Sequence, residues 1–336
     1  MLQPRLCGQL LLDWYQSKRR ELPWRATHDP WRILLSEVML QQTRVVAVIP
    51  YYERFLNRYP TPLALAEAPE QELLAMWSGL GYYARARNLQ RAARAISELG
   101  AFPETLEQIR ALPGVGEYTA AAVASIAFGL PHAVLDGNVV RVLSRLTAER
   151  GEVQNNTVRV RLKQTAQTML DPRRPGDFNQ ALMELGATVC LPRAPQCLLC
   201  PLREHCSALA EGIQNELPVK LNKRDAIKLA IELLLVEKEG RVLMRQRGPN
   251  EPRLAGFWEL PEPRFIPSAR RTAKLGEFRH SITQHDYTVE VWRADPVKAP
   301  KGFRWIPQAE LAALPLATTA RKAFAVAGQP VPELGG

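Results

Sequence analysis

Apolar residues recur at intervals of three and four positions through most of residues 1–212, which is the spacing of helices that bury one face. Short connections join such stretches. The pattern is clearest in WRILLSEVMLQQT, PLALAEAPEQELLAMWSGL, YYARARNLQRAARAISEL and TLEQIRAL. We therefore predict that residues 1–212 form an all-α domain.

The pattern changes after residue 212. Residues 213–227 are expected to be a linker, and KLAIELLLVEKEGRVLMRQR then predicts a strand, a Glu-Gly turn and a second strand. YTVEVWRA alternates with period two, and PQAELAALP returns to helical spacing. The sequence contains no internal repeat and no low-complexity tract. It predicts an α+β second domain over residues 228–334.

The composition is that of an ordinary globular protein, with 336 residues, 46% hydrophobic and 23% charged, enough for two domains that each bury a core. The net charge is +10. Residues 1–220 contribute 25 − 21 = +4 and residues 221–336 contribute 19 − 13 = +6. Because both parts carry the excess, a polyanionic partner, nucleic acid before a membrane surface, is one interpretation. A basic protein without such a partner is the other.

The N-terminal stretch MLQPRLCGQLLLDWYQ predicts an amphipathic helix rather than a signal peptide, because its apolar run reaches Asp13 without a small-residue cleavage site. No run approaches the roughly 18 apolar residues of a membrane-spanning helix. We therefore expect a cytosolic chain with no membrane partner.

Four of the five cysteines lie together in CLPRAPQCLLCPLREHC, at Cys190, Cys197, Cys200 and Cys206. In a cytosolic chain this crowding indicates a metal site rather than disulfides. Structural zinc sites usually combine two C-x2-C pairs, whereas this run has one such pair and several prolines. It favours a compact loop around a cubane iron–sulfur cluster, with zinc as the alternative. Cys7 stands apart and is predicted to be a buried core thiol.

Two carboxyl groups stand in contrasting sequence surroundings. Glu37 lies in a helical stretch with the pattern of a core helix, next to Leu34, Val38, Met39 and Leu40. Burial there disfavours the ionised form and raises the pKa. Asp136, in HAVLDGNVVRVL, lies near a predicted helix N-terminus, where backbone N–H groups and the helix dipole favour the ionised form. One raised and one lowered pKa are typical of an acid paired with an anionic stabiliser. A solvated glutamate and a capping aspartate are the structural alternatives.

LPGVGEYTA places the turn Gly114-Val115-Gly116 directly before a predicted helix. Backbone N–H groups at such a helix start suit a phosphate oxygen. Contacts of this kind hold a DNA backbone in register without recognising its sequence. The turn supports a DNA-binding interpretation, although Gly-x-Gly turns are common.

Together these stretches resemble the helix-hairpin-helix DNA glycosylases that carry a four-iron cluster, and among them the MutY family of adenine glycosylases. The resemblance covers nearly the whole chain. Its motifs stand in the family's order: LPWR, SEVMLQQTRVVAVIPYYERF, WSGLGYYARARNL, LPGVGEYTA, LDGNVVRV, FNQALMELGATVC and the cysteine spacing. It implies that the chain excises adenine mispaired with 8-oxoguanine or guanine in double-stranded DNA.

The resemblance also implies an arrangement of the first domain. A six-helix barrel would span about residues 30–133, with the helix-hairpin-helix at 108–128. Residues 1–29 and 134–212 would form the half that binds one [4Fe-4S] cluster through the four crowded cysteines. A monomer in a bacterial-type cytoplasm, associated with the nucleoid, is expected.

By the same resemblance Glu37 is the general acid that protonates adenine N7 and later helps to activate water. Asp136 would stabilise the oxocarbenium-like sugar, with Asn138 and Tyr118 supporting both carboxyls by hydrogen bonding. Tyr118 occupies the position of the lysine that forms a Schiff base in the related endonuclease III type. The resemblance therefore implies a monofunctional enzyme without efficient strand cleavage.

Further positions match residues that contact DNA in this family. Those that match the pocket for the flipped base are Trp24, Arg25, Leu40 and Gln180. Those that match the duplex wedge or the damaged base are Gln42, Thr43, Leu80 and Tyr82. For Leu40 and Leu80, core packing is the alternative. Phosphate contacts or a solvated helix face are the two interpretations of Arg85, Arg87, Arg91 and Arg94.

The C-terminal domain resembles the Nudix-like module of the same family, most clearly in RLAGFWELPE. The run of glutamates that forms the Nudix catalytic box is absent, so lesion recognition is the expected role. The family's Phe-Ser-His triplet falls on HSITQHDY, where Thr283 matches the serine and keeps a hydroxyl group. Ser281, Gln284 and His285 are the alternative contacts with the lesion.

Three other functions compete with this interpretation. An endonuclease III-like glycosylase and lyase for oxidised pyrimidines would use the same scaffold. A non-catalytic iron–sulfur DNA-binding protein would make both carboxyls structural. A Nudix hydrolase fused to a DNA-binding domain would need the catalytic box that is missing.

Overall fold

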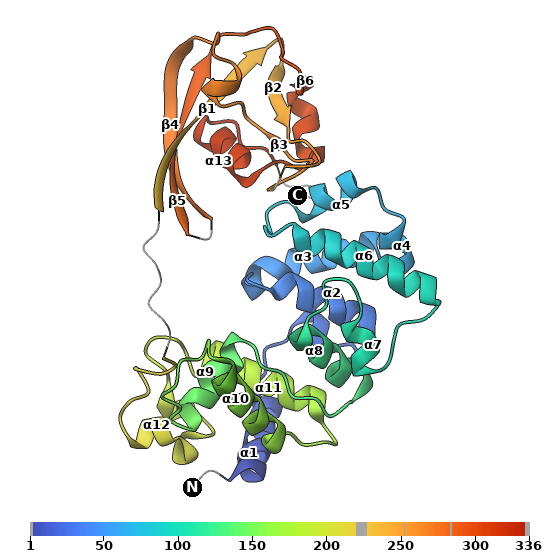
Figure 1. Cartoon of the computed structure of the whole chain (residues 1–336), viewed down its shortest axis with the longest axis vertical. Coiled ribbons are helices and arrows are strands. Elements are labelled where there is room, and N and C mark those ends of the chain that lie inside the picture. Colours follow the sequence, from blue (N-terminus) through green and yellow to red (C-terminus); the bar gives the residue numbers. More distant parts are fainter. Residues whose placement is uncertain (1–2, 220–226, 252, 283, 333–336) are drawn as a thin grey trace. The chain divides into compact units, whose positions relative to one another are not determined.

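The structure is a computed structural model that describes residues 3–219, 227–251, 253–282 and 284–332 (Figure 1). The chain forms two compact units. The first comprises Met1–Ala66 and Asn88–Asn222, and the second comprises Glu67–Arg87 and Lys223–Gly336. Residues 220–226 of the predicted linker lie outside the described residues. The grouping of residues 67–87 with the second unit was not predicted from the sequence.

The first unit is helical, as predicted. Its α-helices are α1 (Pro4–Lys18), α2 (Pro30–Leu40), α3 (Val45–Arg58), α4 (Pro62–Ala66), α6 (Ala84–Leu99), α7 (Leu106–Arg110), α8 (Glu117–Phe128), α9 (Gly137–Leu146), α10 (Asn156–Met169), α11 (Pro175–Thr188) and α12 (Ser207–Ala210). The first turn of α6, residues 84–87, is grouped with the second unit. Its 3-10 helices are η1 (Pro23–Arg25), η2 (Cys197–Leu199) and η3 (Arg203–His205). Cys7 on α1 is fully buried, which confirms its predicted place in the core.

Side-chain caps explain where helices α2 and α9 begin. Asp29 caps α2 by accepting hydrogen bonds from the backbone N–H groups of Trp31 and Arg32, and Pro30 fixes the first helical residue. Asp136 caps α9 in the same way. Within the described ranges, no helix combines the length and the apolar character needed to cross a membrane.

The second unit carries the predicted α+β fold. Its elements are α5 (Glu70–Trp77), β1 (Ile227–Lys238), β2 (Arg241–Gln246), β3 (Trp258–Glu259), η4 (Pro263–Phe265), β4 (Arg271–Ile282), β5 (His285–Ala294), β6 (Phe303–Pro307), η5 (Gln308–Ala313) and α13 (Thr318–Val326). The predicted Glu-Gly turn joins β1 to β2 at Glu239 and Gly240, both with positive φ. The predicted helix near residue 310 is the 3-10 helix η5.

The sheet is mixed, with strand order β3-β2-β1-β5-β4 and β6 paired to β2. β1 and β5 run parallel, and the other pairs are antiparallel. The run Leu233–Val236 in β1 is buried on both faces of the sheet. Leu233 and Leu235 pack with Phe324 of α13, and Leu234 packs with Ile266 on the other face. This two-sided burial explains why β1 has a continuous apolar run rather than an alternating one.

Candidate active site

A pocket of about 570 Å³ opens in the first unit among α2, α8, α11 and the start of α9. This volume is within the range of small-molecule sites. The predicted residues that line it are Trp24, Arg25, Glu37, Leu40, Gln42, Thr43, Tyr118, Asp136, Asn138 and Gln180. We call it the central pocket. It collects residues that are up to 187 − 20 = 167 positions apart in the chain, from Arg20 to Ala187.

Glu37 projects from α2 into the central pocket with 6% of its surface exposed. Burial raises the pKa of Glu37 to about 7, and the negative charge of Asp136 adds to this rise. The hydroxyl of Tyr118 donates a hydrogen bond of 2.7 Å to Glu37 Oε2 and opposes the rise. The same hydroxyl lies 3.1 Å from Met183 Sδ. The raised pKa that the sequence predicted for Glu37 is confirmed.

The prediction for Asp136 is half wrong. Asp136 does cap α9, with Oδ1 accepting a 2.7 Å hydrogen bond from the backbone N–H of Val139. Burial nevertheless raises the pKa of Asp136, and the hydrogen bonds from Val139 and Asn138 offset this only in part. Helix capping could be predicted from DGN, whereas the depth at which the cap is buried could not.

Asn138 connects Asp136 to the interior of the first unit. Its Nδ2 donates a 3.0 Å hydrogen bond to Asp136 Oδ2, and its Oδ1 accepts a 2.9 Å hydrogen bond from Arg141. Arg141 also donates to the backbone oxygens of Gly186 and Cys190, at 2.7 and 2.8 Å. These contacts fix the Asn138 amide with its nitrogen toward the carboxylate.

Several residues of the central pocket were not predicted from the sequence. On α11, Met183, Glu184 and Ala187 line the pocket beside the predicted Gln180, which is the spacing of one helix face. Arg20, ahead of η1, and Gln41, after α2, also line the pocket. A signal was available, because Glu184 stands between apolar residues in ALMELGA much as Glu37 does in LLSEVML.

The Gly-x-Gly turn has the predicted form, between α7 and α8. Gly114 has a φ of +75°, and a Cβ there would approach Asn88 Cβ to 2.4 Å, so both backbone conformation and space require glycine. Gly116 is the N-cap of α8 and offers no side-chain cap. The first N–H groups of α8 are thus left to a partner outside the helix.

Leu80 and Tyr82 belong to the second unit, in the loop between α5 and α6. Leu80 is buried, in line with the core alternative. Tyr82 is 52% exposed and has a φ of +48°, which is strained for a tyrosine.

The four arginines of α6 differ from one another. Arg85 is buried and donates to the backbone oxygens of Leu80 and Gly81, so a solvated face and a free phosphate ligand are both wrong for this residue. Arg87 pairs with Glu70. The two arginines that are exposed are Arg91, which donates to Asn88, and Arg94, which donates to the backbone oxygen of Ala66.

The expected lesion contacts lie where β4 and β5 meet. Thr283 itself lies outside the described residues. Next to it, Ser281 and Gln284 are exposed, and His285 is partly buried with its ring stacked on Tyr287. Ser281 is thus exposed near the end of β4, and Gln284 is exposed just before the start of β5.

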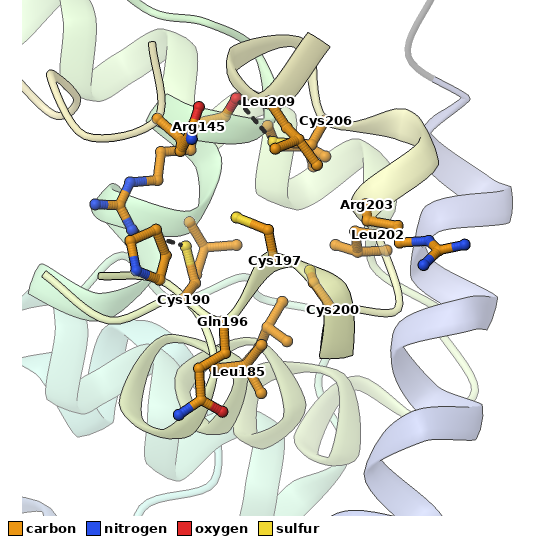
Figure 2. A pocket seen from close by; sticks show the side chains of 15 residues that line it. Arg145, Leu185, Cys190, Gln196, Cys197, Cys200, Leu202, Arg203, Cys206 and Leu209 are labelled. Carbon is orange, nitrogen blue, oxygen red and sulfur yellow. Dashed lines mark hydrogen bonds between the residues drawn. The ribbon is translucent and has the colours of Figure 1, made fainter. Parts of the chain in front are cut away.

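The four crowded cysteines line one cavity in the first unit, and Figure 2 shows their side chains gathered around it. Cys190 Sγ accepts a 3.3 Å hydrogen bond from Arg145, a residue of α9. Burial raises the pKa of Cys200 to about 12 and also raises the pKa of Cys197 and Cys206. Among the described residues, no three His, Cys, Asp or Glu side chains are grouped closely enough to hold one metal ion.

Comparisons with known proteins agree on both units. Residues 35–168 match the model of the HhH-GPD superfamily of base excision DNA repair proteins, and residues 232–326 match the NUDIX domain. The chain is 34% identical to the adenine DNA glycosylase of Homo sapiens, over 94% of this chain and 73% of that protein. It is 36% identical to the adenine DNA glycosylase of Mus musculus, over 94% of this chain and 76% of that protein.

Two solved structures resemble the first unit. A thermostable thymine-DNA glycosylase superposes with a TM-score of 0.57 at 32% identity, covering 62% of this chain and 97% of that one. Endonuclease III in a non-covalent complex with DNA superposes with a TM-score of 0.54 at 26% identity, covering 64% of this chain and 100% of that one.

Proposed function

The chain belongs to the adenine DNA glycosylases, and from this premise we propose that it removes adenine opposite 8-oxoguanine or guanine in duplex DNA by hydrolysis alone. The observation that carries the proposal is the 2.7 Å hydrogen bond from Tyr118 to Glu37, in a pocket that Asp136 also lines. A titrating acid and a capped carboxylate then face the same space, which suits cleavage of a glycosidic bond.

Glu37 starts the reaction by donating its proton to N7 of an adenine flipped into the central pocket. With a pKa of about 7, a large fraction of Glu37 holds that proton at neutral pH. The C1′–N9 bond then breaks, and its electron pair leaves with the neutral base. Asp136 stabilises the positive charge that develops on the sugar. The Glu37 carboxylate finally accepts a proton from the water that attacks C1′.

The proposal that the enzyme is monofunctional rests on the central pocket's lack of an amine nucleophile. Tyr118 stands in the hydrogen-bonded position beside Glu37, and no lysine is among the described residues that line the pocket. A Schiff base with the sugar needs such an amine. Borohydride should therefore trap no covalent protein–DNA adduct, and a strong trapped band would reject hydrolysis alone.

DNA binding is proposed at the turn Gly114–Gly116, and the net charge of +10 favours a polyanionic partner. The start of α8, where the N-cap Gly116 offers no side-chain cap, supports a phosphate contact there. Endonuclease III, which resembles the first unit, has been solved with DNA bound.

We also propose that Cys190, Cys197, Cys200 and Cys206 hold one [4Fe-4S] cluster. Four thiols line one cavity, and their irregular spacing in the chain fits a cubane cluster, whose irons each bind one cysteine, better than one zinc ion. When bound, the cluster would hold the loop 190–206 in place. Analysis of protein purified without air should find about four iron and four sulfide per chain. Stoichiometric zinc would refute the cluster.

The preference for 8-oxoguanine is assigned to Thr283 and the strand ends beside it. Thr283→Ala should narrow the difference in excision between 8-oxoguanine and guanine partners by about 1–3 kcal/mol, the cost of one lost hydrogen bond. Ser281→Ala and His285→Ala are the matched controls. An effect in Ser281→Ala or His285→Ala, with none in Thr283→Ala, would show that Ser281 or His285 contacts the lesion instead of Thr283.

One assay tests the function as a whole. Duplexes with adenine opposite 8-oxoguanine, guanine or thymine are incubated with the protein, with and without alkali. Adenine should leave the first two duplexes, and strand breaks should appear only after alkali. Breaks without alkali, or excision of oxidised pyrimidines instead, would favour the endonuclease III-like alternative. Hydrolysis of free oxidised nucleotides would point to the second unit.

A further inference from the structure

Glu184 lies on the α11 face of the central pocket with only 1% of its side chain exposed. Its carboxylate accepts hydrogen bonds from two arginines. Arg20 donates from its backbone N–H, Nε and Nη2, at 3.1, 2.7 and 2.7 Å. Arg25 donates from Nη2 at 2.8 Å. A buried carboxylate with this many charged donors is strongly held in its ionised form, and the arginine contacts lower the pKa of Glu184 to about 2 despite its burial.

Arg25 is the member of this group that reaches furthest inside, with 10% of its side chain exposed against 39% for Arg20. Its other contacts are the backbone oxygen of Arg20, at 3.1 Å, and the ring of Tyr15, 5.4 Å from the guanidinium carbon. Among the described residues, Glu184 is therefore the one carboxylate that forms an ion pair with Arg25. Without it, a buried guanidinium would lose its compensating charge.

We propose that Glu184 is a positioning residue that holds Arg25 at the adenine pocket and limits the positive charge that Glu37 experiences. The inference rests on the proposed role of Glu37 as the proton donor. Two arginines and one carboxylate leave a net charge of +1 beside the pocket. Neutralising Glu184 would double that charge, next to a site where positive charge must develop on the sugar.

The groups that shift the pKa of Glu37 determine in which direction each variant should move that pKa. Tyr118 of α8 and Arg25 of η1 lower the pKa of Glu37, and Asp136 ahead of α9 raises it. α3 also packs against α2, but its charged residues, Glu53, Arg54 and Arg58, are not among the groups that shift Glu37. Glu184 is not among these groups either, and it reaches Glu37 through its ion pair with Arg25. A change in that ion pair should therefore appear in the titration of Glu37.

The test measures single-turnover adenine release against pH, around the Glu37 pKa of about 7. The rate should fall as pH rises through that value, because the proton donor is lost. This fall is the alkaline limb of the pH–rate profile. Glu184→Gln keeps the shape and removes the negative charge, so the alkaline limb should move to lower pH, by less than about one unit. The Arg25 guanidinium would keep its charge beside the pocket but lose the contact that orients it, which should also lower the maximum rate by about 10- to 100-fold.

Arg20→Gln makes the opposite change and keeps the Arg25–Glu184 pair. It removes a positive charge, so the alkaline limb should move to higher pH. Glu149→Gln is the matched control for Glu184→Gln. It removes one negative charge from the Glu149–Arg161 ion pair, which lies outside the pocket, and should leave the alkaline limb in place.

Opposite movements of the limb in Glu184→Gln and Arg20→Gln would support the inference. A limb that neither variant moves would overturn it, even if rates fall, because a merely structural residue lowers rates without changing the titration. If Glu184→Gln does not fold, the direction in Arg20→Gln decides. A parent protein without an alkaline limb would instead reject the proposed role of Glu37, and with it this inference.

Discussion

Two buried glutamates line the central pocket from different helices, Glu37 on α2 and Glu184 on α11. Both stand among apolar residues in the sequence, and both are almost completely buried. Burial raises the pKa of Glu37 to about 7, whereas the pKa of Glu184 is lowered to about 2 because Arg20 and Arg25 donate to its carboxylate.

The two glutamates show the separate effects of burial and of charged hydrogen-bonding partners on a carboxyl pKa. Burial pushes both pKa values upward. The two residues differ in their hydrogen-bonding partners and in the charge of Asp136, which raises the pKa of Glu37 alone. Among the described residues, Glu37 accepts a hydrogen bond from one neutral donor, the Tyr118 hydroxyl, and so remains able to give up and regain a proton near neutral pH. Glu184 has charged donors and stays ionised. One pocket therefore contains a glutamate suited to proton transfer and a glutamate suited to holding cations.

The largest effect is expected from Glu37→Gln. The amide keeps the shape but has no acidic proton, so single-turnover excision should fall by roughly 10²–10⁴-fold or more. Binding to an 8-oxoguanine:adenine duplex should stay close to that of the parent, as measured by equilibrium titration. Excision at nearly the parent rate would show that another group is the general acid, and that Glu37 and Glu184 do not differ in the way described. A joint loss of binding and folding would make Glu37 structural.

Asp136→Asn should lower the excision rate by about 10²–10³-fold, because a neutral amide stabilises the developing sugar cation less well. It also sharpens the comparison. Asp136 raises the pKa of Glu37 but is not among the groups that shift Glu184. The residual activity should therefore have its alkaline limb at lower pH than the parent. A limb at higher pH would contradict the assigned electrostatics.

The two glutamates should affect stability in opposite directions with pH. The folded-state pKa of Glu184 lies below its ordinary value of 4.5, so its contribution is present above that value and is lost as pH falls toward about 2. This contribution is about 3 kcal/mol near neutrality. The folded-state pKa of Glu37 lies above 4.5, so the folded state loses a similar amount, about 3 kcal/mol, as pH rises from 4.5 through about 7.

Urea unfolding of the two Gln variants checks these signs. Above pH 7, Glu37→Gln should be more stable than the parent and Glu184→Gln less stable. At a pH near 4, the advantage of Glu37→Gln should vanish, whereas the deficit of Glu184→Gln should remain in large part. The same sign in both variants would show that pairing does not distinguish the two residues.

The smallest effect is expected from Tyr118→Phe, which removes the neutral donor of Glu37. Loss of this hydrogen bond is worth about 1–2 kcal/mol, or roughly a tenfold change in rate. Because the donor lowers the pKa of Glu37, the alkaline limb should move to higher pH. Tyr118→Phe leaves Glu184 and its arginines in place, so the contribution of Glu184 to the free energy of unfolding below pH 4 should change little. A limb that moves to lower pH would show that Tyr118 does not favour the ionised form.

Much of the fold could be predicted because its signals are local. Helical spacing up to residue 212, the Glu-Gly turn between β1 and β2, and the Gly-x-Gly turn before α8 depend on residues close together in the chain. The raised pKa of Glu37 could also be predicted, because its apolar neighbours lie on its own helix. The grouping of residues 67–87 with the second unit could not be, since it depends on distant contacts such as Tyr83 with Phe257.

The site shows where local signals end. By itself the sequence determined that Glu37 is on a core helix, that Asp136 caps a helix, and that four cysteines lie within one short loop. Only the tertiary structure decided that burial outweighs capping at Asp136, and that Glu184 meets Arg20 across 164 positions. The physical reason is that periodicity, capping and turn chemistry act within a few residues, whereas a carboxyl's charge state depends on the depth and the partners that packing brings to it.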